Sequence, residues 1–111
     1  MNQLERFNDI IATYRKHGWY LKRVLMRLET RAAVGEPSDA LFEGVAVQEA
    51  PLDALWFARA SHAGREAWEL RLVDAAPYAL FVTFEADESE EDREEVRREM
   101  EARLRDYTAR A

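Results

Sequence analysis

Cysteine is absent from this sequence of 111 residues. Disulfide bonds, thiolate nucleophiles and zinc sites built on thiolates are therefore excluded. Glycine is scarce and scattered along the chain, which argues against a phosphate-binding loop or a dinucleotide fingerprint. Hydrophobic runs are far shorter than the about 20 residues that a membrane-spanning helix needs. The first residues carry no signal-peptide pattern, so we expect a cytoplasmic protein of bacterial type that binds no membrane.

Residues that carry catalysis or bind metals are also few. The two histidines, His17 and His62, have no carboxylate at a metal-ligand spacing. No serine stands in the glycine-flanked turn that exposes a catalytic nucleophile. We therefore assign no catalytic, metal or cofactor residues and expect no cofactor. Enzymatic activity is left open, although the prediction leans against it, because two carboxylates in a cleft are sufficient for some reactions.

The composition is that of one folded domain over residues 1–111, since 48% of the residues are hydrophobic and 34% are charged. The net charge of −6 is unevenly distributed. Residues 1–31 carry seven Lys or Arg against three Asp or Glu, a balance of +4. The rest of the chain carries nine against nineteen, a balance of −10. The acidic total disfavours nucleic acid as a partner, because affinity for phosphate depends on positive charge.

Helices are predicted at both ends of the chain. Near the start, hydrophobic residues recur every three or four positions from Leu4 to Tyr14, with Asn2 as the N-cap and Gly18 as the stop. Near the end, a narrower hydrophobic stripe runs from Val96 to Tyr107 behind an N-cap at Ser89.

Between the helices we predict an antiparallel sheet of about four strands. Their ranges are 19–29, 52–61, 66–73 and 78–85. The first range also has a helical spacing of hydrophobic residues, so a helix over 19–31 is the alternative. The connection between the first two strands is compatible with one helical turn at Ser38 to Phe42. The predicted fold class is α+β, with the two helices packed on one face of the sheet.

Several predicted strands are hydrophobic on both faces, which two helices on one face would leave partly uncovered. An exposed hydrophobic patch of this kind usually marks an interaction surface. In the first strand, Arg23 and Arg27 would share a face with Trp19, an arrangement that binds anionic groups. The candidate interaction residues are Trp19, Arg23, Arg27, Trp56, Phe57 and Phe81.

The order helix, sheet, helix in a small acidic chain resembles the type III secretion chaperones and their non-secretory relatives. That resemblance rests on element order and net charge, and the chain departs from the pattern because it has no clear second internal helix. It implies a dimeric α+β protein that binds peptides.

Three functional hypotheses follow. The first is a non-enzymatic protein-interaction module that acts as a homodimer or binds another protein. The alternative is a small-molecule-binding or catalytic α+β domain with a hydrophobic groove and Arg23 or Arg27 as anchors. The third is a weak nucleic-acid binder that uses the basic first third of the chain.

Overall fold

The computed structural model describes residues 2–35 and 41–110. Within them lie an N-terminal helix, a five-stranded sheet and a C-terminal helix, which confirms the α+β class. The elements in chain order are α1 (Gln3–Lys16), β1 (Tyr20–Met26), α2 (Leu28–Val34), β2 (Ala46–Glu49), β3 (Ala54–Ala60), the short 3-10 turn η1 (His62–Gly64), β4 (Glu66–Leu72), β5 (Ala79–Phe84) and α4 (Glu90–Arg110).

Both terminal helices begin at the predicted caps. The Asn2 side chain accepts a hydrogen bond of 2.8 Å from the Glu5 backbone N–H, and the Ser89 hydroxyl accepts one of 3.1 Å from the Asp92 backbone N–H. After α1, Gly18 adopts a φ of +85°, which turns the chain directly into β1. The caps therefore fix where the two helices start relative to the sheet.

The sheet has the strand order β2-β1-β3-β4-β5. Its pairs are antiparallel except for β1 and β2, which run parallel through the connection that contains α2. The four predicted strands are present, but β1 ends at Met26, and Leu28 begins α2 instead of continuing the strand. We did not predict β2, a short strand inside the expected loop. Of the helical turn expected at 38–42, residues 38–40 lie outside the described residues.

A β-bulge in β1 changes which face its side chains occupy. Leu21 pairs with Phe57 and Arg23 pairs with Trp56, so Lys22 is an extra residue. Before the bulge, Trp19 and Leu21 pack on the α1 side, whereas Leu25 after it packs on the α4 side. The expectation that Arg23 shares a face with Trp19 and Leu21 is therefore wrong, because it assumed an unbroken strand.

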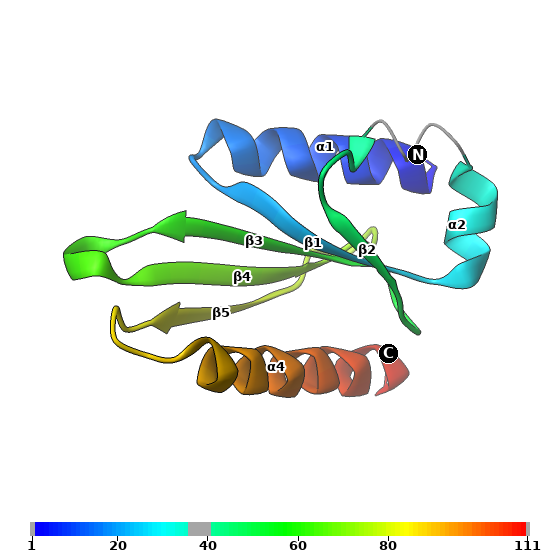
Figure 1. Cartoon of the computed structure of the whole chain (residues 1–111). Helices are drawn as coiled ribbons and strands as arrows, with labels where there is room; N and C mark the ends of the chain where they lie inside the picture. Colours follow the sequence, from blue (N-terminus) through cyan, green and yellow to red (C-terminus); the bar gives the residue numbers. More distant parts are fainter. Residues whose placement is uncertain (1, 36–40, 111) are drawn as a thin grey trace.

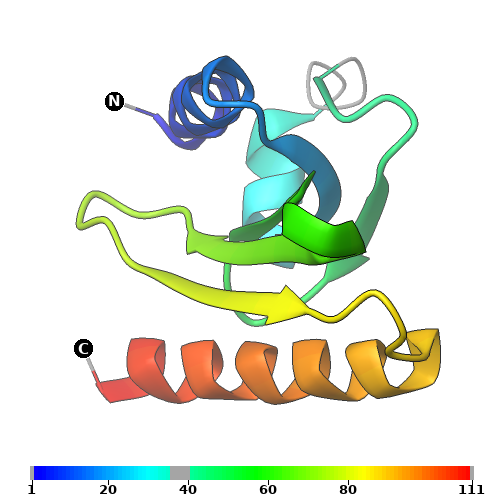
Figure 2. The same ribbon diagram turned by 90° about the vertical axis from the view of Figure 1, so that its left-hand side faces the viewer.

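The helices cover both faces of the sheet, and the prediction that both pack on one face is wrong. In Figures 1 and 2, α1 and α4 lie on opposite sides of the sheet, with α2 near the α1 side. The physical reason lies in β3, which is buried on both faces. Leu55 and Phe57 belong to the core under α1, whereas Trp56 belongs to the core under α4. A central strand that is hydrophobic on both faces needs cover on both.

Candidate functional site

The predicted interaction residues do not form one surface. Trp56 and Phe57 are fully buried, on opposite faces of β3. Trp19 is buried in the core under α1, and its ring lies 6.4 Å from that of Phe81 in an edge-to-face arrangement. Phe81 alone among the four aromatic residues is largely exposed, at 59%. The expected exposed patch over Trp56 and Phe57 is therefore absent from these described residues, because α4 covers the face that was assumed to be open.

The two predicted arginines are also separated. Arg23 reaches down to α4, where its guanidinium lies 2.8 Å from a carboxylate oxygen of Glu94. Arg27 follows the end of β1, and its Nε lies 3.7 Å from the buried carboxylate of Asp53. Each arginine thus has a carboxylate partner within the chain. They do not form the joint surface for an anionic ligand that the predicted strand implied.

β5 is an edge strand of the sheet, with β4 as its neighbour on one side and no described strand on the other. The Leu72 N–H donates to the Tyr78 carbonyl at 2.9 Å, and Leu80 and Val82 are in register with Leu70 and Trp68. In an antiparallel pair, hydrogen-bonded positions alternate along the strand. The residues between them therefore direct their backbone N–H and C=O groups away from β4. These residues are Ala79, Phe81 and Thr83, and their side chains are exposed too.

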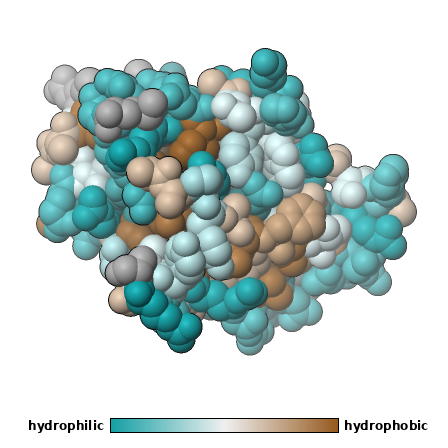
Figure 3. Space-filling view, turned by 180° about the vertical axis from the view of Figure 1, so that it is seen from behind, coloured by the Kyte–Doolittle hydropathy of each residue, from teal (hydrophilic) through white to brown (hydrophobic). Residues whose placement is uncertain are grey.

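Hydrophobic atoms gather on this side of the molecule. Figure 3 views it from behind, where β5 forms the sheet edge, and brown atoms extend across the middle between hydrophilic regions. β5 has the sequence Ala-Leu-Phe-Val-Thr-Phe and contains no charged residue and no proline. Natural edge strands usually carry charges, prolines or bulges that prevent pairing with another chain. The β5 edge has none of these protections.

Beside Phe81, an aromatic cluster lines a cavity of about 240 Å³ between α1 and the sheet. The Tyr14 ring stacks on Phe57 with 4.0 Å between centroids, and its hydroxyl donates to the Glu69 carboxylate. Burial, and then the hydrogen bond to Glu69, raises the pKa of the Tyr14 hydroxyl far above its ordinary value. The tyrosine therefore stays protonated and is a hydrogen-bond donor rather than a catalytic base.

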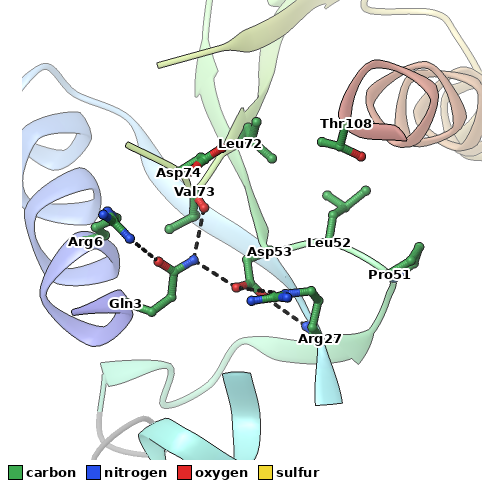
Figure 4. Close-up of a pocket in the computed structure, with 10 residues that line it drawn as sticks. All are labelled: Gln3, Arg6, Arg27, Pro51, Leu52, Asp53, Leu72, Val73, Asp74 and Thr108. Carbon is green, nitrogen blue, oxygen red and sulfur yellow. Dashed lines mark hydrogen bonds and ion pairs between the residues drawn. The ribbon is translucent and has the colours of Figure 1, made fainter. Parts of the chain in front are cut away.

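A second cavity, of about 340 Å³, lies where the N-terminal end of α1 approaches the C-terminal end of α4 (Figure 4). Its centre is Asp53, whose side chain is almost fully buried. The carboxylate accepts hydrogen bonds from the Thr30 hydroxyl at 2.7 Å, the Arg27 backbone N–H at 2.8 Å and the Gln3 amide at 2.9 Å. A buried charge needs several such donors, so Asp53 ties three elements together.

The rim of this cavity carries two guanidinium groups. Arg6 extends from α1 and donates to the Gln3 side chain at 3.0 Å, and Arg27 lies on the other side of Asp53 (Figure 4). Hydrophobic side chains line part of the wall, and Thr108 contributes a hydroxyl. Of these residues, the sequence pattern indicated Arg27 but not Asp53, Gln3 or Arg6. The one available signal was an isolated acidic residue, Asp53, directly before a strongly hydrophobic strand.

Beneath the sheet, an ionic cluster joins α4 to the strands. Arg97 is 1% exposed, and its guanidinium donates to Glu90 at 2.6 Å and to Glu94 at 3.0 Å. The hydrogen bond from Arg97 lowers the pKa of Glu90, and the hydrogen bond from Arg23 lowers that of Glu94. The cluster joins charges within the chain and therefore has a structural role.

Within the described residues, no three side chains of His, Asp or Glu come close enough together to bind a metal ion. None of the helices in the described ranges combines the length and hydrophobicity needed to cross a bilayer. Comparison of the chain with protein-family models, with curated proteins and with solved structures found no match.

Proposed function

We propose that this chain is a non-enzymatic protein-interaction module that acts as a homodimer by pairing the β5 strands of two copies. The observation that carries the proposal is the unprotected outer edge of β5, with Phe81 exposed at its centre. Adding a strand to such an edge satisfies its backbone hydrogen bonds and is a common mode of protein recognition. The dimer would contain one continuous sheet that crosses the interface.

The outward residues of β5 are compatible with a twofold axis at Phe81. Antiparallel pairing about this axis places Phe81 opposite the partner's Phe81 and Ala79 opposite the partner's Thr83. Ala79, Phe81 and Thr83 each direct their backbone N–H and C=O away from β4. In the paired strands, every one of these groups would therefore form a hydrogen bond with the partner's β5. Aromatic residues directly opposite each other also stabilise a strand pair. The pairing brings no charged side chains of the two strands together.

The opposite edge of the sheet is less suited to pairing. β2 has only four residues and ends at Glu49. Short edge strands and charged side chains are two of the ways in which proteins prevent edge-to-edge association. We therefore assign the strand pairing to the β5 edge and not to the β2 edge.

The test is the molar mass in solution, measured by size-exclusion chromatography with light scattering over a range of concentrations. We expect a dimer for the wild type and a monomer for Phe81→Lys, because the substitution places two like charges opposite each other at the axis. The matched control is Tyr20→Lys, which changes an aromatic residue of 65% exposure on β1 and should leave the dimer intact. Circular dichroism shows whether each variant is folded.

Two results would contradict the proposal. One is a wild type that is monomeric at every concentration. The other is a folded Phe81→Lys variant that dimerises as strongly as Tyr20→Lys. A further variant, Thr83→Pro, removes an outward N–H without removing a bond to β4, so it should also weaken the dimer.

A second candidate function is the binding of a small carboxylate with a short hydrophobic body in the cavity beside Asp53. The specific observation is the pair of guanidinium groups, from Arg6 and Arg27, at the rim of a cavity whose wall is partly hydrophobic. Guanidinium groups bind carboxylates through paired hydrogen bonds. Since the Arg27 Nε already lies 3.7 Å from the Asp53 carboxylate, Arg6 would be the main anchor for the ligand.

This candidate is tested by NMR titration with 4-methylpentanoate and with its neutral amide. We expect shifts at the cavity residues with the carboxylate alone, and weaker binding in Arg6→Gln. The matched control is Arg31→Gln, an exposed arginine that does not line this cavity. Equal binding of the amide, or unchanged binding by Arg6→Gln, would exclude the arginines as anchors.

A further inference from the structure

The charged side chains on one flank of α4 have partners within the chain, whereas those on the other flank have none in the part of the chain that the structure describes. On the flank toward β1, Glu94 pairs with Arg23, and Glu101 accepts a hydrogen bond of 2.8 Å from the Trp56 indole. On the flank toward β5, four charged side chains have no hydrogen bond or ion pair to any described residue. These four are Asp92, Glu99, Arg103 and Arg110.

Two hydrophobic residues show that the second flank of α4 faces β5. Tyr107 stacks on Tyr78, the residue directly before β5, with 3.7 Å between ring centroids. Val96 packs against the core that contains Leu80 and Val82 of β5. Helical residues three or four positions apart share a flank, so the four unpaired charges lie in a row with Val96 and Tyr107. This row, named here the outer flank, lies beside the open edge.

The charges of the outer flank are complementary to those of a second copy that runs in the opposite direction. Its first half carries Asp92 and Glu99, and its second half carries Arg103 and Arg110. An antiparallel copy centred between Glu99 and Arg103 places Glu99 beside the partner's Arg103 and Asp92 beside the partner's Arg110. The same alignment places Val96 opposite the partner's Asp106, one residue from the partner's Tyr107.

The strand axis and the helix centre coincide. Phe84, at the end of β5, lies under the guanidinium of Arg97, with 5.2 Å between them, and Tyr78 stacks on Tyr107. Phe81 lies midway between these two contacts along β5, so a twofold axis at Phe81 passes near the middle of the α4 segment from 97 to 107. That is the centre required by the outer-flank charges.

The spacing also allows contact between the helices. Neighbouring strands lie about 4.8 Å apart, and α4 packs beneath β4 and β5. After β5 pairs with its copy, the two α4 helices lie on the same face, separated by about 10 Å, a normal helix-packing distance. We infer that α4 forms the second half of the dimer interface, as an antiparallel helix pair whose outer flanks match acidic side chains with the partner's arginines. This inference rests on the proposed β5 homodimer.

The experiment uses two charge-changed forms of the full chain. The basic-flank variant carries Asp92→Arg and Glu99→Arg, and the acidic-flank variant carries Arg103→Glu and Arg110→Glu. Each alone brings like charges together across the axis, so we expect its dimer Kd to rise about tenfold or more. An equimolar mixture should recover a stable heterodimer, which light scattering and native mass spectrometry would detect. The matched control, Arg98→Glu with Arg105→Glu, changes the charge as much as the acidic-flank variant does, but on the exposed side of α4 away from the outer flank, and should dimerise like the wild type.

The outcomes separate the two proposals. If both flank variants dimerise normally while Phe81→Lys is monomeric, the strand pairing stands and the helix pair is overturned. The helix pair is also overturned if the mixture stays monomeric like its components. Recovery in the mixture cannot come from contacts within one helix, because each chain still carries only like charges on its outer flank. A monomeric wild type would overturn both proposals.

Discussion

The guanidinium of Arg97 lies over the indole of Trp68, with 3.9 Å between the guanidinium carbon and the ring centroid. This contact places a charged side chain at a position of α4 that faces the sheet, between Met100 and the first turn. The charge is tolerated there because the ring face attracts the cation and because Glu90 and Glu94 reach it from one side. The pair is therefore one of the contacts that hold α4 against β4.

Replacement of Arg97 by alanine removes the stacking, both ion pairs and a large buried volume. We expect the free energy of unfolding of Arg97→Ala to fall by about 3 kcal/mol. Arg97→Met retains most of the volume and no charge, so its loss should be about 1.5 kcal/mol or less. Urea denaturation followed by tryptophan fluorescence measures both values. Equal losses of unfolding free energy in the two variants would show that Arg97 stabilises the fold through its charge and not through its packing volume.

The same cluster predicts a loss of stability in acid. The pKa values of Glu90 and Glu94 are lower in the folded chain than their ordinary value of 4.5. The stabilisation from their ion pairs is therefore complete above about pH 4.5 and is lost as the pH falls through the folded values. Urea denaturation at neutral pH and at steps below 4.5 measures this slope. Glu94→Gln should flatten it, whereas Glu95→Gln, on the exposed side of α4, should leave it unchanged.

Asp53 should be among the most sensitive polar positions in the chain. Its replacement by alanine leaves the Thr30 hydroxyl and the Arg27 N–H without their acceptor and removes one of the two acceptors of the Gln3 amide. We expect Asp53→Ala to lower the free energy of unfolding by about 3 kcal/mol. Asp74→Ala, on the exposed rim of the same cavity, should stay within about 0.5 kcal/mol of the wild type. A similar effect of the two substitutions, measured by thermal and chemical unfolding, would contradict the central role of Asp53.

Two glycines with positive φ should respond differently to alanine. A Cβ at Gly18 would meet nothing within 4 Å, whereas one at Gly64 would lie 3.0 Å from the Ala86 Cβ. Gly18→Ala should therefore cost only the backbone strain, about 1 kcal/mol. Gly64→Ala should cost about 2 kcal/mol, because it adds a steric overlap between η1 and the turn after β5. The melting temperatures of the two variants measure this difference. A lower melting temperature for Gly18→Ala than for Gly64→Ala would contradict the prediction.

The helix ends and the strand pattern of β3 to β5 were predictable because local signals determine them. Asn2 and Ser89 mark caps that need no tertiary partner, and the alternation in β4 identifies its buried face. The face of each residue in β1 was not predictable. The extra residue at Lys22 depends on how β1 pairs with β3, and that pairing joins residues far apart in the sequence. β2 was missed for a similar reason, since four residues with a single partly buried side chain, Val47, offer almost no periodicity.

The candidate sites were less predictable than the fold. Phe81 was selected for its place in a two-faced strand, and it is exposed only because β5 is the last strand in the order. Strand order is a property of the whole sheet, and no residue near Phe81 encodes it. Trp56 shows the opposite case, because the same two-faced pattern on the central strand leads to complete burial under α4. The hydrogen bonds around Asp53 join Gln3, Thr30 and Val73, and no short motif could have linked these residues.

The unequal edges of the sheet have a consequence for assembly size. A subunit with two open edges would bind a neighbour on each side and grow into a fibre. Here β2 is short and ends in a carboxylate, so the proposed pairing through β5 would stop after a single step. The proposed dimer would therefore be a finite particle, with a β2 strand at each end of its sheet.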